Sequence, residues 1–303
     1  MPKLRYLVLA GPTAVGKTEL AIRVAQDLQT EIVGADAFQL YQDLDILTGK
    51  PSPSQLRAVP HHLVGILPLT ELCDAHKYAV LARQTVADLN QREIIPLVVG
   101  GTGFYLHALE GGIPQSPPAD LALRAELDSL STPDLLRDLE SRDSAASNQI
   151  DRHNRRRVIR ALEVCILSGK PFSSFLGNTA SDPAICRIVL ERPRAVLTEK
   201  INRRVDEMFE RGVVAEVAAV EAIGPTASKA IGFQLIRSLL AGAIDISICR
   251  ETIKQQTRDY GKRQMTWFRR QPSVLFAAES SVDFLVAAFR RRLSELASKP
   301  TSF

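Results

Sequence analysis

Residues 4–18, LRYLVLAGPTAVGKT, decide the fold class, because an apolar stretch runs directly into a glycine-rich pattern. The pattern G-x-x-x-x-G-K-T follows an expected strand at 4–10 and opens an expected helix at 17–28. In that context backbone N–H groups and the helix N-terminus surround a phosphate, Lys17 adds a positive charge, and the Thr18 hydroxyl is a magnesium ligand. The predicted loop comprises Gly11, Pro12, Thr13, Ala14, Val15, Gly16, Lys17 and Thr18. We therefore predict a diphosphate or triphosphate ligand, which the motif does not identify further as ATP or another molecule.

Further strands and helices alternate along the chain. We expect strands at 31–35 and 94–99, with a helix at 75–90 between them, and a strand at 185–190 later in the chain. This alternation is typical of an α/β fold with a doubly wound parallel sheet. The C-terminal part adds expected helices at 197–211, 213–222 and 246–270.

A helical insertion interrupts this alternation. The chain becomes proline-rich at 114–118, and residues 121–168 have a helical pattern without a convincing strand. We therefore predict a P-loop core formed by residues 1–114 and 184–303, and a helical insertion subdomain at 115–183.

Composition limits the class of protein. The 303 residues are 45% hydrophobic and 24% charged, which indicates a soluble globular chain. No apolar run approaches the roughly 20 residues that a membrane-spanning helix needs. The four cysteines are scattered without zinc-binding spacing, so a reducing cytoplasm fits best.

Positive charge is concentrated in two places, although the net charge is only +4. Residues 152–160 contain five arginines, and residues 250–270 contain seven basic and two acidic residues. Arg250, Lys254, Arg258 and Lys262 recur every four residues and so share one face of a helix. Such a stripe is either a solvated face or a phosphate contact, and Trp267 nearby fits the core better than a ligand.

Asp36 directly follows the expected strand at 31–35, at the edge where open α/β sheets bind ligands. Its carboxylate has three open roles: magnesium ligand, proton acceptor, or cap of the following loop. A second glycine turn, Gly100-Gly-Thr102-Gly103, follows the strand at 94–99 and belongs to the same edge. By itself this turn is a weak signal.

Taken together, six motifs in order over nearly the whole chain resemble the tRNA dimethylallyltransferase family. The motifs are GPTAVGKT from Gly11, DAFQLYQDLDILTGKPS from Asp36, HHLVGI from His61, GGTGFYLHAL from Gly100, RRVIRALEV from Arg156 and TRDYGKRQMTWFRR from Thr257. The chain departs from the usual family pattern at Ala37, Leu47, Gly49 and Arg156, none of which is a catalytic group.

The resemblance implies a magnesium-dependent transfer of a dimethylallyl group from dimethylallyl diphosphate to N6 of the adenosine on the 3′ side of the anticodon. It implies that the loop at 11–18 holds the diphosphate, with Thr18 on magnesium, and that Asp36 is the general base. Lys17, Thr18 and Thr102 would share the catalytic work with Asp36. The implied contacts to the tRNA anticodon stem-loop are Asp36, Ala37, Phe38, Gln39, Thr102, Arg124, Arg156, Arg157, Val158, Ile159 and Arg160. A monomer in the cytoplasm, without membrane association, is expected.

Three other interpretations compete with this one. An adenylate isopentenyltransferase would modify free adenine nucleotides, a P-loop kinase would phosphorylate a small metabolite, and an RNA-binding protein would carry a vestigial P-loop. Within 157–163 the arginines are also explained by the helix alone, with one of them bracing the insertion through Glu163 or Asp151.

Overall fold

The computed structural model describes residues 4–111, 116–175, 186–271, 274–278 and 281–297. The chain divides into two compact units, which we call the core unit (residues 1–110 and 181–303) and the helical unit (residues 111–180). The predicted insertion at 115–183 has bounds a few residues away, and its residues 176–183 lie outside the described part of the chain.

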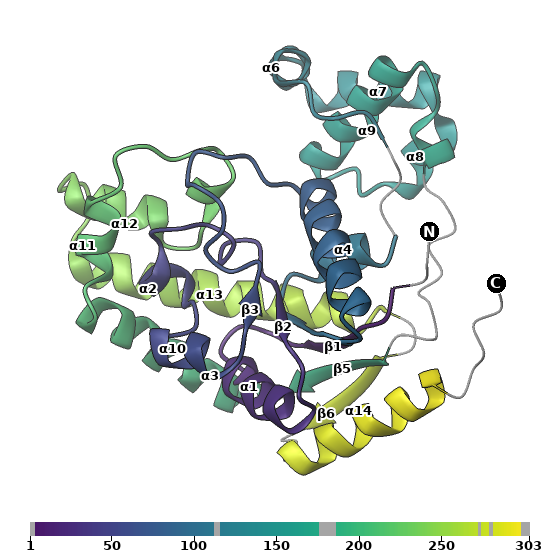
Figure 1. Cartoon of the computed structure of the whole chain (residues 1–303). Helices are drawn as coiled ribbons and strands as arrows, with labels where there is room; N and C mark the ends of the chain where they lie inside the picture. Colours follow the sequence, from purple (N-terminus) through teal and green to yellow (C-terminus); the bar gives the residue numbers. More distant parts are fainter. Residues whose placement is uncertain (1–3, 112–115, 176–185, 272–273, 279–280, 298–303) are drawn as a thin grey trace. The chain divides into compact units, whose positions relative to one another are not determined.

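The core unit is built on a sheet of six strands that all pair in parallel (Figure 1). In spatial order the strands are β3 (His61–His62), β2 (Ile32–Ala35), β4 (Leu97–Gly100), β1 (Leu7–Ala10), β5 (Cys186–Glu191) and β6 (Val274–Ala278). β1 and β2 are buried along their whole length, as expected for parallel strands covered on both faces. The predicted parallel α/β core is confirmed.

Two of the strands start later than the sequence pattern suggests. β1 begins at Leu7 because the backbone N–H and carbonyl of Arg5 both bond to the Asn90 side chain, at 2.8 and 2.9 Å. β4 begins at Leu97 because Pro96 has no N–H to give to a neighbouring strand. The Pro96 carbonyl still accepts a hydrogen bond from the N–H of Leu7 at 3.0 Å.

Helices cover both faces of the sheet in the core unit. α1 (Lys17–Asp27) and α14 (Val282–Ala297) lie on one side, and α4 (Ala75–Gln91) lies on the other (Figure 1). α5 (Gly103–Leu109) packs on α4, where the rings of Tyr78 and Tyr105 stack with centroids 4.1 Å apart. An apolar cluster joins β1, α1 and α14.

The remaining helices of the core unit come after β2 and after β5 in the chain. They are α2 (Asp45–Thr48), α3 (Pro53–Ala58), α10 (Arg194–Glu210), α11 (Val213–Ala218), a 3-10 turn (Ala227–Lys229), α12 (Phe233–Leu240) and α13 (Ile246–Phe268). The helix expected at 213–222 ends at Ala218, ahead of the Gly224-Pro225 pair that does not continue a helix. α13 packs against α10, α12 and α5.

The helical unit consists of α6 (Leu121–Ser129), α7 (Thr132–Arg142), α8 (Ser144–Gln149), α9 (Arg155–Ser168) and a 3-10 turn (Phe172–Phe175). Within its described residues, 116–175, there is no strand. Its own apolar core includes Leu135, Leu139, Val158 and Leu162, all fully buried. Within the described ranges of either unit, no helix has both the length and the apolar character needed to cross a membrane.

The apolar cluster predicts that two phenylalanines of α14 contribute unequally to the free energy of unfolding. Phe289 is fully buried and Phe284 is 48% exposed, although both belong to the same helix. We expect Phe289→Ala to lower the free energy of unfolding by about 3–5 kcal/mol, because it leaves a cavity in the core. Phe284→Ala, the matched control, should change it by less than about 1 kcal/mol. Chemical denaturation of both variants measures the difference, and equal losses would contradict the assigned packing.

Candidate active site

The phosphate-loop sequence joins the end of β1 to the start of α1. Gly16 caps α1 with a positive φ of 102°, a conformation that side chains other than glycine rarely adopt. The ammonium of Lys17 turns back across the loop and donates to the carbonyls of Gly11 at 2.9 Å and Pro12 at 2.8 Å. The loop is thus closed by its own lysine, whose third N–H has no hydrogen-bond acceptor among the described residues.

Burial makes the charge of Lys17 costly. Desolvation lowers the pKa of Lys17 to about 8; Asp36 opposes this shift, and Arg204 adds to it. A cation held in this way gains from a nearby anion more than a solvated lysine does, because the surrounding dielectric constant is low.

Asp36 follows β2 and is half-buried. One carboxylate oxygen, Oδ1, accepts from the backbone N–H groups of Phe38 at 3.0 Å and Gln39 at 3.3 Å. Asp36 therefore does cap its loop, which was one of its three predicted roles. The other oxygen, Oδ2, has no hydrogen-bond donor among the described residues, so capping leaves it open to accept a proton or a metal.

Thr102 lies beside this loop because β2 and β4 are neighbours, with Ala35 opposite Gly100. Its hydroxyl accepts from the N–H of Ala37 at 3.1 Å. Tyr260 of α13 closes the same region, and burial raises its pKa to about 12, with the nearby Asp36 adding to the shift. A phenol of this kind stays protonated at neutral pH.

Gln264 of α13 connects two of the glycine-rich loops. Its amide oxygen accepts from the N–H of Thr13 at 2.9 Å, and its amide nitrogen donates to the carbonyl of Gly101 at 2.8 Å. The residue is only 6% exposed, and its bond to Gly101 is buried. A neutral side chain thereby holds the phosphate loop against the turn that carries Thr102.

Arg204 of α10 is a site residue that the sequence interpretation missed. One guanidinium nitrogen donates to the Thr13 hydroxyl and the other to the Thr48 carbonyl, both at 3.1 Å. Burial lowers the pKa of Arg204, and the charge of Asp36 opposes that shift. In the sequence, the only indication of a site at Arg204 is a second basic residue, Lys200, four positions earlier. Exposed helices also show this spacing.

These side chains surround a cavity of about 380 Å³ in the core unit. Four cations line it, namely Lys17, Lys200, Arg203 and Arg204, together with the acids Glu19, Asp36 and Glu207. Of the predicted site residues, it is lined by Thr13, Ala14, Gly16, Lys17, Thr18, Asp36, Phe38 and Gln39. The loop residues Gly11, Pro12 and Val15 are buried and do not line the cavity. Ala37 and Thr102 support the lining through their mutual hydrogen bond.

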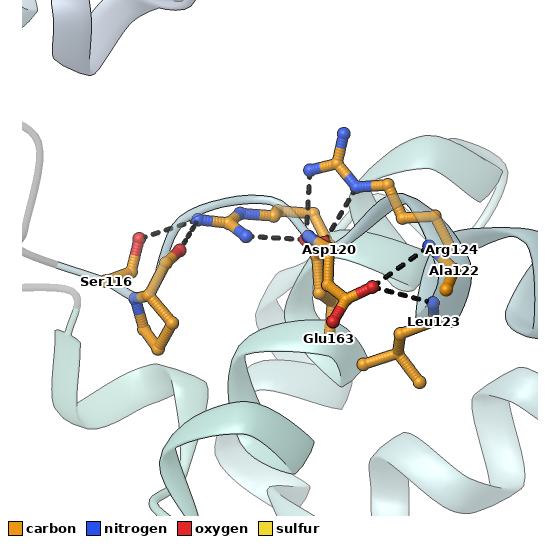
Figure 2. A network of polar contacts seen from close by, with 8 residues as sticks. Ser116, Asp120, Ala122, Leu123, Arg124 and Glu163 are labelled. Carbon is orange, nitrogen blue, oxygen red and sulfur yellow. Dashed lines mark hydrogen bonds and ion pairs between the residues drawn. The ribbon is translucent and has the colours of Figure 1, made fainter.

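The arginines predicted to contact RNA in the helical unit have different surroundings. Glu163 is fully buried and binds Arg124 through two hydrogen bonds of 2.9 Å and Arg160 through one of 2.5 Å (Figure 2). Arg160 also donates to the Ser116 hydroxyl and the Pro117 carbonyl. Burial raises the pKa of Glu163, but the hydrogen bonds from the two arginines outweigh that effect and lower it. Arg160 therefore braces this unit.

The other predicted residues of α9 divide between core and surface. Val158 and Ile159 are 0% and 5% exposed and belong to the apolar core of the helical unit, so their side chains are not accessible to an RNA. An RNA contact at these two positions stays a prediction. Arg156 and Arg157 are exposed, and neither guanidinium has a hydrogen bond or ion pair within residues 116–175.

Three of the four basic residues in the α13 stripe bind side chains of α10, whereas Lys262 is exposed. Arg250 and Lys254 pair with Asp206 of α10 at 3.6 and 2.9 Å, and Arg258 donates to Asn202 of the same helix at 2.6 Å. The stripe is therefore used mainly for packing between two helices. Trp267 is partly buried against Gly103, and Phe268 is 2% exposed, so the preference for core packing at Trp267 agrees with its position.

Fold and cavity together define a class: an α/β protein with a parallel sheet, a glycine-rich loop after its first strand and a cation-lined cavity. The family model described as "IPP transferase" matches residues 39–271, and the one described as "Isopentenyl transferase" matches residues 4–65.

Individual proteins agree with these matches. A tRNA dimethylallyltransferase of Akkermansia muciniphila is 37% identical over 96% of this chain and 99% of its own length. One of Thermotoga neapolitana is 38% identical over 90% of this chain and 92% of its own. The chain therefore belongs to the IPP transferase family.

Two solved structures are similar to this chain. The tRNA isopentenylpyrophosphate transferase of Bacillus halodurans is 30% identical, with a TM-score of 0.70 over 98% of this chain and 100% of its own. A eukaryotic dimethylallyltransferase acting on tRNA, at 22% identity, shares the fold with a TM-score of 0.78 over 99% of this chain and 81% of its own.

The lowered pKa of Lys17 predicts how anion binding depends on pH. Only the charged form attracts diphosphate, and its fraction falls as the pH rises through about 8. Binding above that pH must be accompanied by proton uptake, so the Kd for inorganic diphosphate should rise by up to about tenfold per pH unit.

Calorimetric titrations between pH 7 and 9.5 measure this trend. Lys17→Met should bind more weakly and lack the lysine-dependent rise, and the comparison cancels the ionisation of diphosphate itself. Parallel pH profiles for the two proteins would contradict the assignment.

Proposed function

We propose that this protein transfers a dimethylallyl group from dimethylallyl diphosphate to N6 of the adenosine on the 3′ side of the anticodon in tRNA. The products are N6-isopentenyladenosine in tRNA and diphosphate. The observation that carries the proposal is one cavity containing an anion-binding loop with Lys17 and Arg204, and a carboxylate, Asp36, with a free oxygen. Membership in the IPP transferase family supports this assignment of substrates.

The phosphate side of the cavity suits an allylic diphosphate. Such a molecule reacts by loss of its diphosphate, so the main requirement is to stabilise the negative charge that leaves. Lys17 and Arg204 are half-buried cations whose pKa is lowered by desolvation, and Lys200 and Arg203 add charge at the lining. Their attraction to the departing group is stronger here than it would be in water.

Magnesium fits this donor set. Among the described residues no group of three or more His, Cys, Asp and Glu side chains could hold a metal ion alone. Magnesium, however, is commonly bound by one or two protein oxygens together with substrate phosphates and water. The Thr18 hydroxyl would hold it together with the diphosphate oxygens, and it would neutralise charge on the leaving diphosphate.

Asp36 handles the proton on the acceptor side. The N6 amine forms a bond to C1 of the dimethylallyl group, while the C1–O bond breaks and its electron pair leaves with diphosphate. The nitrogen then carries an extra proton, which passes to the free Oδ2 of Asp36. The two N–H groups on Oδ1 keep the carboxylate oriented, and Thr102 fixes the same loop through Ala37.

The proposed RNA contacts in the helical unit are Arg124, Arg156 and Arg157. The last two are exposed cations without partners in residues 116–175, which is the state expected of side chains that neutralise RNA phosphates. Arg124 is 38% exposed and held in place by Glu163. In the core unit, Phe38 and Gln39 line the cavity into which the target base would be flipped.

As part of the same proposal, the protein works as a cytoplasmic monomer.

Mass spectrometry of nucleosides tests the proposed function. The protein is incubated with dimethylallyl diphosphate, magnesium and unmodified tRNA, and we expect one added prenyl group on adenosine beside the anticodon. Prenylation of free adenosine monophosphate instead would favour an adenylate isopentenyltransferase, and ATP turnover without prenyl transfer would favour a kinase. A competent tRNA that stays unmodified would refute the proposal.

Asp36→Asn is expected to keep the fold and diphosphate affinity, because asparagine still accepts the two loop N–H groups. Turnover should fall by roughly 10²- to 10⁴-fold, the contribution of a positioned proton acceptor. Asp88→Asn, an exposed change on α4, is the control. Single-turnover rates measure the effect, and a near-parental rate would reduce Asp36 to a loop cap.

The arginines of α9 should separate into two groups. Arg156→Ala and Arg157→Ala should raise the KM for tRNA and reduce the salt slope of binding by about one unit, without changing Tm. Arg160→Ala should instead lower the free energy of unfolding by about 1–3 kcal/mol, because it removes a partner of buried Glu163.

Filter binding of tRNA over a salt series, with thermal melts, checks this division. Arg137→Ala, at an exposed position of α7, controls for the loss of any surface arginine in this unit. If the exposed arginine variants keep the parental salt slope and KM, RNA binds elsewhere.

A further inference from the structure

The short helix α2 lies at the wall of the cavity and is held at its N-terminus by a side chain from far along the chain. The carboxylate of Glu216, on α11, accepts the N–H of Ile46 at 2.7 Å with one oxygen and the N–H of Leu47 at 2.8 Å with the other. N–H groups at the start of a helix have no acceptor within the helix itself. Glu216 thus satisfies two of them with a charged, two-point contact, which is stronger and more directional than a neutral bond.

The other end of α2 supports two residues of the proposed site. The carbonyls of Thr48 and Gly49 accept from the amide nitrogen of Gln39 at 3.3 and 3.0 Å. The Thr48 carbonyl also accepts from Arg204, whose other nitrogen binds the Thr13 hydroxyl in the phosphate loop. A chain of hydrogen bonds therefore runs from Glu216 through α2 to both Gln39 and Arg204.

Close packing makes this connection stiff. Gly49 ends α2 with a positive φ of 62°, and a Cβ atom at this position would overlap the guanidinium of Arg204. Leu47 is buried, so α2 is also fixed from its apolar side. A displacement of α2 would therefore move the carbonyl that orients Arg204 and the two carbonyls that orient Gln39.

We propose that Glu216 is a positioning residue that sets the orientation of the Arg204 guanidinium, and of Gln39, by anchoring α2 at the cavity wall. Arg204 has five N–H groups, of which two are bound by Thr13 and Thr48. With those two fixed, the remaining donors have a defined direction, as recognition of a diphosphate requires. The proposal deepens the proposed function and rests on it for the identity of the diphosphate donor.

Titration with inorganic diphosphate in the presence of magnesium tests Glu216 without any RNA. We expect Glu216→Ala to weaken diphosphate binding about tenfold, because two N–H groups lose a charged acceptor and α2 is released. Glu216→Gln keeps one acceptor oxygen and the side-chain length, so its loss should be smaller, about threefold. Glu221→Ala, at an exposed position just after α11, is the matched control and should bind like the parental protein.

Thermal melts of every variant accompany these titrations. Glu216→Gln is decisive if Glu216→Ala does not fold, since it changes neither the length nor the volume of the side chain appreciably. Folded variants that bind diphosphate with the parental Kd would overturn the proposal. A lower Tm with an unchanged Kd would overturn it as well, because it would show that Glu216 stabilises the fold only.

A double-mutant cycle separates positioning from independent effects. If Glu216 acts through Arg204, then adding Glu216→Ala to Arg204→Ala should weaken diphosphate binding by less than about twofold further. Fully additive losses would show that Glu216 influences the cavity by another route, against the proposal.

Enzyme kinetics distinguish failure of this inference from failure of the proposed function. If the parental protein prenylates tRNA, the KM for dimethylallyl diphosphate should rise in Glu216→Gln, and an unchanged KM would refute the positioning role alone. If the parental protein does not prenylate tRNA, the proposed function fails. The diphosphate titrations then still decide whether Glu216 orients Arg204 for anion binding.

Discussion

Parallel pairing of β1, β4 and β2 is the constraint on which the rest of this structure depends. The register places Ala10 and Ala35 on either side of Gly100, so the three strands end at one level. The chain leaves each strand into the phosphate loop, the Thr102 turn and the Asp36 loop respectively. Residues of these three loops lie close together although they are far apart in the sequence; Gly11 and Thr102, for example, are separated by 91 positions.

The cavity at this edge brings several positive charges together on partly buried side chains. Burial lowers the pKa of both Lys17 and Arg204, which shows that their charges are held at a cost. Asp36 reduces this cost, and the neutral Gln264 supplies hydrogen bonds between loops without adding charge. An anionic ligand of the size of a diphosphate would relieve the repulsion between the cations, so binding and electrostatic stabilisation act in the same direction.

The basic residues have different roles, which depend on their surroundings in the structure. Arg250, Lys254 and Arg258 bind acceptors on α10 and so join two helices of the core unit. Arg124 and Arg160 share the buried Glu163, whereas Arg156 and Arg157 of α9 extend into solvent. Of these four arginines of the helical unit, only the last two have no partner within residues 116–175, and charge density along the sequence does not distinguish these cases.

The sequence by itself determined the features that depend on neighbouring residues. The apolar strand, the glycine-rich loop and the following helix at 4–27 are encoded locally, as are the parallel α/β alternation and the place of Asp36 after its strand. Tertiary structure decided what depends on residues far apart: the use of Arg204 and Gln264 in the cavity, the burial of Val158 and Ile159, and the anchoring of α2 by Glu216, 170 positions from Ile46. Helical periodicity states which residues share a face, but not which other helix or loop that face meets. A charged side chain can therefore be recognised as polar from its sequence, while its partner is fixed only when the chain folds.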